Sequence, residues 1–375
     1  MLNVLHLINY PGRGGSERYI VSLAEKLHNK KCRFYLAYSE EGPMIDVLKQ
    51  LGVEVFNIQM KNPYDFKAAK SVKSICKQLS IDVVHTHFLR ENFISVFSKL
   101  MGNRVVLVNT IHLFAKNNLL INISSFLLNI FVDRTIVVSN SLKKQISALG
   151  LSSRRIDVIH NGVDIDFWKG RRSLRARKKL GLDSSDFVIT SVARFSEEKG
   201  HIFLLEAIKV FKKIARYNKD KIPNNVKFLL AGEGELLEEC KGFAKALGVA
   251  DCVIFTGYQE NIREILHASD LYISHSKFET LGISILEALA CRLPVVATNS
   301  GGPSEILTEE NACGLLVDYG DTEGFAGAIG KFITDKGFYK KCRNNAFRTV
   351  EEKFNLDKTV EETYNLYIRS LTAGF

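Results

Sequence analysis

The sequence lacks long hydrophobic runs, paired cysteines and a dinucleotide-binding fingerprint, and each absence excludes a class of protein. No charge-free apolar run reaches about 18 residues, so we expect no transmembrane helix. The seven cysteines are an odd number and form no C-x-x-C pair, which argues against a disulfide framework and a zinc site. The pattern G-x-G-x-x-G, typical of dinucleotide-binding enzymes, is also missing.

The length and composition indicate a globular protein of two domains. A chain of 375 residues is too long for one ordinary core. Its 46% hydrophobic and 25% charged residues are usual proportions for a protein folded in water. The N-terminal sequence is typical of a strand and a loop, without the basic segment or cleavage site of a signal peptide. We therefore expect a cytoplasmic protein.

The net charge of +10 raises the question of an anionic partner. Basic residues cluster at Lys143-Lys144, at Arg154-Arg155 and most densely at 169–179. Such patches suit nucleic acid or an anionic membrane, but they also occur as solvated surface or as a charged linker. Because no nucleic-acid-binding motif is present, we predict no nucleic-acid partner. Peripheral contact with an anionic membrane stays open beside the two structural alternatives.

Apolar strands and helical stretches alternate along the first half of the chain. The expected strands cover 2–8, 33–38, 54–58, 83–87, 105–110, 134–138 and 156–159. This alternation predicts an α/β fold with a parallel sheet covered on both faces. The pattern begins again at 187–192, which predicts a second domain of the same kind. Ligands of such sheets bind beyond the carboxyl ends of the strands.

The stretch 277–305 carries two carboxylates, Glu279 and Glu287, eight positions apart. Apolar residues predict a helix over 282–290, and the unpaired N–H groups at a helix start can bind a phosphate. Glutamates around a helix are usually solvated, but the apolar neighbours of Glu287 predict a buried carboxylate that needs a partner. A phosphate between two carboxylates suits a nucleotide sugar.

Arg194 and Lys199 follow the strand expected at 187–192. Two cations in this position suit a diphosphate clamp, and a solvated loop is the alternative. No D-x-D element lies in a suitable place to hold a metal, so we expect no metal cofactor.

A glycine-rich loop follows the first expected strand. Gly14 and Gly15 allow close backbone approach, and Ser16 is expected to cap a helix over 16–28. A plain tight turn is the alternative. The later strand at 134–138 ends at Ser139, which is a candidate cap for a helix over 141–148.

Three histidines lie at the ends of two expected strands. His85 and His87 come at the end of 83–87, and without an accompanying cysteine or carboxylate set they indicate structural histidines more than metal ligands. His112 follows the strand 105–110.

These motifs together resemble one enzyme family. The pair Glu279 and Glu287 is similar to the E-x7-E signature of retaining glycosyltransferases with the GT-B fold, of the family 4 type. Further matching positions are Leu293-Pro294-Val295, Gly301-Gly302, Glu305, the GGSE loop at 14–17, Arg194 with Lys199, and HNGVD at 160–164. One departure is Arg292, where the family usually has glycine; we expect it at a helix end, where a cation is tolerated.

The resemblance implies two Rossmann-like doubly wound domains that face a cleft. The implied parts are an N-terminal acceptor domain at 1–165, a linker at 166–184, a nucleotide-sugar-binding domain at 185–354 and a C-terminal helix at 355–375 that crosses back to the first domain. The segment 119–131 is either a buried helix or a lipid- or acceptor-facing one, as in membrane-associated members of the family.

The resemblance also implies a role for each site residue. Catalytic roles fall to Glu279 and His112, and ribose binding falls to Glu287. The donor diphosphate would contact Arg194, Lys199, Gly15, Gly282 and Ile283; the donor sugar and acceptor would contact Gly14, Ser16, Glu17, Thr280 and Leu281; the base would contact Tyr258.

The implied reaction is transfer of a hexose, with retained anomeric configuration, from a nucleoside-diphosphate sugar to a glycan or lipid-linked acceptor in bacterial surface polysaccharide or glycolipid synthesis. UDP is the expected nucleotide, and the donor is a substrate, so no cofactor is expected. Two alternatives stay open: a non-catalytic nucleotide-sugar or glycan binder of the same fold, and a UDP-sugar epimerase.

Overall fold

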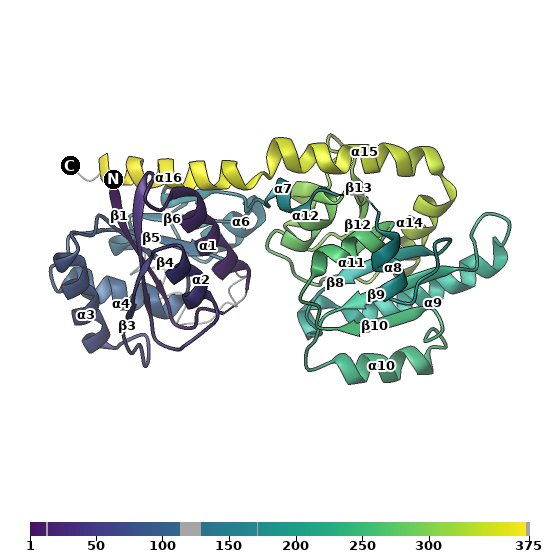
Figure 1. The fold of residues 1–375 in the computed structure, drawn as a ribbon, viewed down its shortest axis with the longest axis horizontal. Coiled ribbons are helices and arrows are strands. Elements are labelled where there is room, and N and C mark those ends of the chain that lie inside the picture. The colour runs from purple at the N-terminus through teal and green to yellow at the C-terminus, as the bar shows by residue number, and fades with distance from the viewer. Residues whose placement is uncertain (13, 113–128, 171, 373–375) are drawn as a thin grey trace. The chain divides into compact units, whose positions relative to one another are not determined.

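The computed structural model describes residues 1–12, 14–112, 129–170 and 172–372, which form two compact units (Figure 1). Unit 1 consists of Met1–Asn161 with Leu356–Phe375, and unit 2 of Gly162–Asn355. The chain therefore leaves unit 1 once and returns to it for the last helix. Within these ranges no helix is long and apolar enough to cross a membrane.

Unit 1 contains a seven-stranded parallel sheet with the order β3-β2-β1-β4-β5-β6-β7. The strands are β1 (Leu2–Ile8), β2 (Cys32–Tyr38), β3 (Glu54–Asn57), β4 (Val83–Thr86), β5 (Val106–Ile111), β6 (Arg134–Val137) and β7 (Ile156–Val158). The helices are α1 (Gly15–Leu27), α2 (Met44–Gln50), α3 (Phe66–Gln78), α4 (Leu89–Leu100), α6 (Asn140–Ala148) and α16 (Leu356–Thr372). Strand order reverses between β1 and β4, so the loops after these strands lie at the switch point where α/β sheets bind ligands.

The last helix, α16, is part of the core of unit 1. Its Val360 and Tyr367 are buried in the same cluster as Val4 and Ile8 of β1. The hydroxyl of Tyr19 in α1 lies 2.8 Å from Thr363 Oγ1, which adds a buried hydrogen bond between the first and last helices. Burial of these side chains explains why α16 is ordered against a unit from which it is distant in sequence.

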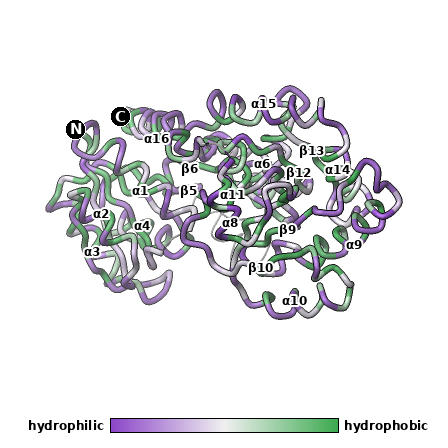
Figure 2. The backbone as a smooth tube through the Cα atoms, turned by 45° about the vertical axis from the view of Figure 1, so that its right-hand side comes forward, coloured by the Kyte–Doolittle hydropathy of each residue, from purple (hydrophilic) through white to green (hydrophobic). Residues whose placement is uncertain are grey.

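Unit 2 contains a six-stranded parallel sheet with the order β10-β9-β8-β11-β12-β13. The strands are β8 (Phe187–Val192), β9 (Val226–Ala231), β10 (Val253–Gly257), β11 (Leu271–Ser274), β12 (Val295–Thr298) and β13 (Gly314–Val317). The helices are α7 (Ile165–Trp168), α8 (Leu174–Lys179), α9 (His201–Tyr217), α10 (Leu237–Ala246), α11 (Ile262–Ala268), α12 (Ile283–Ala290), α13 (Pro303–Ile306), α14 (Thr322–Thr334) and α15 (Lys336–Lys353). Helix α15 is mostly hydrophilic (Figure 2), and its few buried residues include Ala346 and Val350.

The basic stretch 169–179 belongs to unit 2 and uses several of its charges internally. Arg177 is only 1% exposed and donates to Asp270 at 2.5 Å, while Arg172 lies 3.3 Å from the same carboxylate. Lys179 pairs with Glu264 at 2.9 Å. These three cations are therefore neutralised within the unit, and the high charge of the stretch does not by itself make a binding surface.

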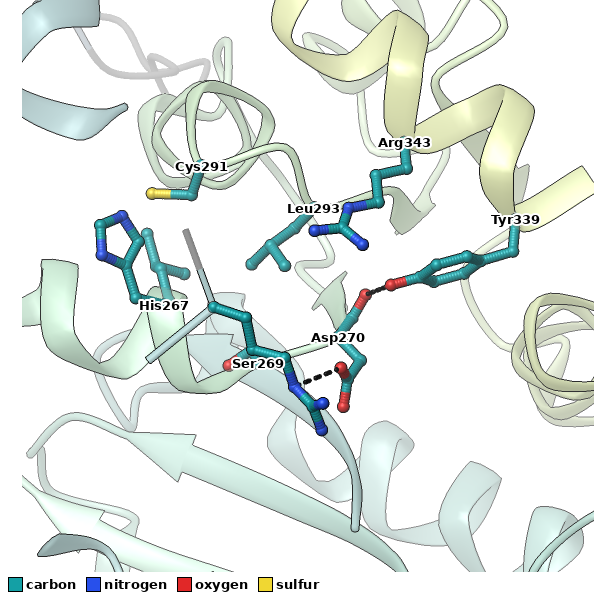
Figure 3. A pocket seen from close by; sticks show the side chains of 9 residues that line it. His267, Ser269, Asp270, Cys291, Leu293, Tyr339 and Arg343 are labelled. Atoms are coloured by element: carbon teal, nitrogen blue, oxygen red, sulfur yellow. Dashed lines mark hydrogen bonds and ion pairs between the residues drawn. The ribbon is translucent and has the colours of Figure 1, made fainter. Parts of the chain in front are cut away.

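The pocket in Figure 3 lies at the amino ends of β11 and β12, because Asp270 and Leu293 come just before these strands. Tyr339 donates from its hydroxyl to the backbone oxygen of Asp270 at 3.0 Å, so α15 is fixed to this end of the sheet. The opposite, carboxyl edge holds the candidate site.

Candidate active site

The loops after β8, β11 and β12 lie side by side, because these three strands are neighbours in the sheet of unit 2. The first loop carries Arg194 and Lys199, the second carries Glu279, and the third carries Gly301 and Gly302. The parallel sheet thus brings residues from three distant parts of the chain to one edge.

Lys199 and Glu279 form an ion pair, with Nζ 2.8 Å from Oε2. Their side chains are 25% and 15% exposed, so the pair is partly buried but still accessible to a ligand. Ser276 donates a further, long hydrogen bond of 3.4 Å to the same carboxylate oxygen. The residue expected to hold the diphosphate and the residue expected to hold the donor sugar are thus in direct contact.

Arg194 pairs with a different carboxylate, that of Glu198, at 2.7 Å. Partial burial works to raise the pKa of Glu198, but hydrogen bonds from Ser196 and Arg194 outweigh it and lower this pKa to about 2. Glu198 therefore stays ionised at neutral pH and holds Arg194. The Arg194 side chain is 67% exposed, so it remains within reach of an anion at the sheet edge.

Two glycines support the Arg194 loop from the neighbouring β9 loop. A Cβ on Gly232 would lie 2.0 Å from the backbone oxygen of Ala193, and one on Gly234 would lie 2.3 Å from that of Phe195. The backbone N–H of Phe195 also donates to the backbone oxygen of Glu233 at 2.8 Å. Glycine is required here because the two backbones approach too closely for a side chain.

His275 fixes the backbone of Lys199, and sequence reasoning missed it. Its Nδ1 lies 2.6 Å from the backbone oxygen of Lys199, and its Nε2 lies 2.9 Å from Ser191 Oγ. Burial lowers the pKa of His275 to about 4, so the ring is neutral at pH 7. Its position directly after β11 was the available signal, since polar residues at strand ends often serve a site.

The stretch from Glu279 to Gly282 is held by the loop after β12. The backbone N–H of Glu279 donates to the backbone oxygen of Ser300 at 3.0 Å, and the backbone N–H of Gly302 donates to the backbone oxygen of Glu279 at 2.8 Å. A Cβ on Gly302 would lie only 2.3 Å from the Cα of Leu281, so this approach requires glycine. The side chain of Leu281 is buried in the core, which leaves only its backbone for a ligand.

Helix α12 begins at Ile283, one residue later than predicted, and Gly282 caps it with a φ of 102°. Glycine adopts this left-handed conformation at little cost. Thr280 lies two residues before this cap.

The C-terminal end of α12 explains the departure at Arg292. This residue has a φ of 62°, a conformation that favours glycine, which the resembling family usually carries there. Its guanidinium lies 4.3 Å from the ring centre of Phe347, and this cation–π contact offsets part of the backbone strain.

Glu287 is 5% exposed in the second turn of α12, which confirms the predicted burial. Burial raises the pKa of Tyr272, and the negative charges of Glu287 and Glu279 raise it further, which places both carboxylates within electrostatic reach of one tyrosine. Tyr258, the expected base contact, is 55% exposed just after the edge strand β10.

In unit 1, the glycine-rich loop is closed by Glu17. Its carboxylate accepts hydrogen bonds from Ser16 Oγ at 2.7 Å and from the backbone N–H of Gly12 at 3.3 Å. The prediction that Ser16 caps the helix was wrong: α1 begins at Gly15 with Gly14 as the N-cap residue, and the Ser16 hydroxyl bonds to Glu17 instead. Ser139 does cap α6, as expected, by accepting from Leu142 at 3.1 Å.

His112 follows β5, and its Nε2 lies 3.2 Å from Nδ1 of His87. Burial lowers the pKa of His112 to about 4. The ring of Tyr19 from α1 lies 5.8 Å away, centre to centre, so His112 is positioned by both β4 and α1. Most of the segment 119–131, for which a buried or lipid-facing helix was expected, lies outside the described residues.

Two family models match the chain. The model described as "Glycosyl transferases group 1" matches residues 173–349, and the one described as "Glycosyltransferase Family 4" matches residues 13–167. They fall in unit 2 and mainly in unit 1, respectively.

Two relatives and one solved structure illustrate the similarity. An Escherichia coli UDP-Gal:alpha-D-GlcNAc-diphosphoundecaprenol alpha-1,3-galactosyltransferase is 27% identical, over 98% of this chain and 97% of that protein. The Bacillus anthracis N-acetyl-alpha-D-glucosaminyl L-malate synthase is 25% identical, over 85% of this chain and 82% of that protein. The Anabaena protein HepE, solved in complex with UDP-glucose, has a TM-score of 0.84 and 22% identity, over 99% of this chain and 100% of that one.

Proposed function

Because the chain belongs to the group 1 and family 4 glycosyltransferases, with the GT-B fold, we propose that it transfers a hexose with retention of anomeric configuration. The donor is a nucleoside-diphosphate sugar, with UDP as the nucleotide, and the acceptor is a glycan or lipid-linked molecule. The observation that carries this proposal is the ion pair of Lys199 and Glu279 at the carboxyl edge of unit 2. The names of the galactosyltransferase and of the UDP-glucose complex support the donor and acceptor classes.

Each group of the site then has a task that follows from its charge. Lys199 and Arg194 neutralise the diphosphate, whose negative charge grows as the bond to the sugar breaks. Glu279 accepts hydrogen bonds from the donor sugar, and Glu287 accepts them from the ribose. Backbone N–H groups around Gly282 supply further donors to phosphate oxygens.

The transfer needs no protein nucleophile. The bond between the anomeric carbon and the diphosphate oxygen breaks, and an acceptor hydroxyl oxygen bonds to that carbon from the same face. The acceptor proton passes to the departing diphosphate, which acts as the base. His112 orients the donor sugar. We also propose that no metal is required, because the two cations Arg194 and Lys199 supply the positive charge that the leaving group needs.

We further propose peripheral contact with an anionic membrane, through α3 of unit 1. Spacings of four and seven residues place Phe66, Lys70 and Lys77 along one stripe of this helix, which contains no acidic residue. Phe66 is 57% exposed, and its ring lies 4.8 Å from that of Phe97, centre to centre. Aromatic rings beside lysines suit a surface of anionic lipid.

The first experiment is a thermal-shift screen with UDP-, GDP- and ADP-linked sugars in metal-free buffer. A ligand at about 100 times its dissociation constant adds roughly 2.7 kcal/mol of stability, which is readily measured. We expect a shift with the UDP class that disappears in Glu287→Ala, while Lys212→Ala, whose side chain pairs with Asp251 instead of a site residue, keeps it. The absence of a shift with every donor would refute the proposed binding site.

Product analysis then separates the enzyme from its alternatives. Transfer to a glycan or lipid-linked acceptor with the anomeric configuration of the donor retained supports the proposal. Donor binding without transfer over a broad acceptor panel would identify a binder. A changed configuration of the UDP-sugar without an acceptor would identify an epimerase.

A further inference from the structure

A chain of histidines crosses the switch point of the sheet in unit 1. His6 lies in β1, His87 follows β4, and His112 follows β5. The Nδ1 atom of His6 lies 3.0 Å from Nε2 of His87, whose Nδ1 lies 3.2 Å from Nε2 of His112. The three rings are thus joined by two successive hydrogen bonds, which end at the histidine expected to face the donor sugar.

All three rings are neutral at pH 7. Burial lowers the pKa of His6 to about 3 and that of His112 to about 4, and it lowers the pKa of His87 well below its ordinary value. A neutral imidazole has one N–H donor and one lone-pair acceptor. His87 uses both of its nitrogens, so the two hydrogen bonds must run in the same direction.

Only two arrangements satisfy this condition. In the first, His6 donates to His87, His87 donates to His112, and His112 carries its proton on Nδ1. In the second, every bond is reversed, so that His6 accepts at Nδ1 and carries its proton on Nε2. The two arrangements differ in which of the remaining ring nitrogens, Nε2 of His6 and Nδ1 of His112, carries a proton.

The surroundings of His6 decide between the two arrangements. Nε2 of His6 is buried and has no hydrogen-bond partner among the described residues. The second arrangement would leave a buried N–H donor without an acceptor there, whereas the first leaves only a lone pair. Orphaned buried N–H groups are rarer than unsatisfied acceptors, so the first arrangement is favoured.

We propose that His6 and His87 are positioning residues that hold His112 in its neutral Nδ1–H form, so that His112 offers a hydrogen-bond donor to the substrate. The identification of that substrate as a donor sugar rests on the proposed function. The assignment of protons to the three rings is independent of it. His112 then orients a hydroxyl or ether oxygen by donating to it. It is not the base that removes the acceptor proton, because its Nε2 lone pair already accepts from His87.

A metal centre is the competing explanation for the same residues. Among the described residues, His6, His85 and His87 are the one group of three or more His, Cys, Asp or Glu residues whose possible metal-ligand atoms all lie within 4.8 Å of one another. Both nitrogens of His85 are already engaged, with Tyr367 Oη at 2.6 Å and Thr110 Oγ1 at 2.7 Å. His87 is engaged on both sides as well, so a metal ion would have to break existing hydrogen bonds.

Nitrogen-15 NMR of the full chain labelled at histidine tests the proposal without any substrate. At pH 7 we expect His6, His87 and His112 to show neutral rings protonated at Nδ1, with His112 assigned by its loss in His112→Gln. A His112 ring protonated at Nε2, or a charged ring, would overturn the proposal. One equivalent of zinc retained through purification and dialysis, measured by elemental analysis, would overturn it in favour of a metal site.

Two variants of His6 separate positioning from simple packing. His6→Asn keeps an amide N–H near the position of Nδ1, so the Nδ1–H form of His112 should persist. His6→Phe keeps the ring but removes the donor, and the His112 signals should move to a mixture of both forms. Identical His112 signals in the two variants would contradict the positioning role, and if His6→Phe does not fold, the wild-type spectrum still decides the direction of the chain. Transferase activity is measured separately, so failure of the proposed function leaves this result interpretable.

Discussion

Nζ of Lys199 lies 2.8 Å from Oε2 of Glu279, although the two residues are 80 positions apart in the chain. Both side chains are partly buried, so each depends on the other for neutralisation more than an exposed pair does. In the reaction proposed above, an arriving diphosphate would pair with Lys199 in place of Glu279, and the sugar hydroxyls would donate to the released Glu279 carboxylate.

Loss of this cation should impair transfer more than folding. We expect Lys199→Ala to lower kcat/KM by roughly 100- to 1000-fold, as does removal of other groups that stabilise transition-state charge. Lys212 pairs with Asp251 at 2.5 Å in the same unit, so Lys212→Ala is the matched control and should leave kcat/KM unchanged. Equal losses in the two variants, measured by product release, would show that Lys199 has no special role.

The close approach of Gly302 to Leu281 predicts a strong effect of a single methyl group. We expect Gly302→Ala to abolish donor binding and to lower the free energy of unfolding by about 1–3 kcal/mol, because the new Cβ overlaps backbone atoms. Gly327 in α14 has open space around its Cβ position, so Gly327→Ala should be neutral or stabilising by up to about 1 kcal/mol. Denaturant unfolding and donor titration measure both effects, and wild-type donor affinity in Gly302→Ala would contradict the proposed geometry.

Buried neutral histidines should make the protein sensitive to acid. The pKa of His6 falls from 6.5 to about 3 and that of His275 from 6.5 to about 4 on folding. Below pH 6.5 the unfolded chain binds protons that the folded chain cannot, so stability is complete above pH 6.5 and is lost as the pH falls toward 4. Each such histidine contributes up to about 1.4 kcal/mol per pH unit in this range. Urea unfolding at several pH values measures the slope; a flat profile between pH 7 and pH 5 would contradict the neutral assignments.

The stripe on α3 predicts charge-dependent membrane binding. Lys70→Glu with Lys77→Glu should reduce sedimentation with vesicles containing anionic lipid at low salt, and Phe66→Ala should weaken it further. Lys212→Glu, in unit 2, is the control and should bind as the wild type does. Equal sedimentation of the wild type and the double variant would exclude this surface.

Chelation should not stop the reaction. With Arg194 and Lys199 as the only required cations, we expect the same rate after dialysis against EDTA as before it. Activity that disappears on chelation and returns with added Mg²⁺ or Mn²⁺ would contradict the metal-independent mechanism.

The order of apolar strands and helical stretches was enough to predict the fold, because each of these elements is indicated by the residues within it. The strands β1 and β8 begin and end at the residues expected from their apolar runs. The half-buried β13 was not predicted, since its sequence begins with glycine and its apolar run of Leu-Leu-Val is shorter than the runs that typically indicate a strand. The helix α12 and the burial of Glu287 followed from the apolar residues around them.

The contacts within the site could not be predicted in the same way, because they join segments distant in sequence. Nothing near Lys199 indicates Glu279 as its partner, and nothing near His112 indicates His6. Ser16 shows that local prediction also has limits. Its hydroxyl was expected to accept from a backbone N–H at the start of α1, but it donates to the adjacent Glu17 carboxylate instead.

The return of α16 to unit 1 determines when each unit can be completed on the ribosome. Unit 2 is a continuous segment and has all its residues once Asn355 has emerged. Unit 1 lacks Val360 and Tyr367 of its core until residues beyond Asn355 have emerged, although its first 161 residues emerge first. We therefore expect the second half of the chain to reach its native state before the first, which reverses the usual N-to-C order of domain folding.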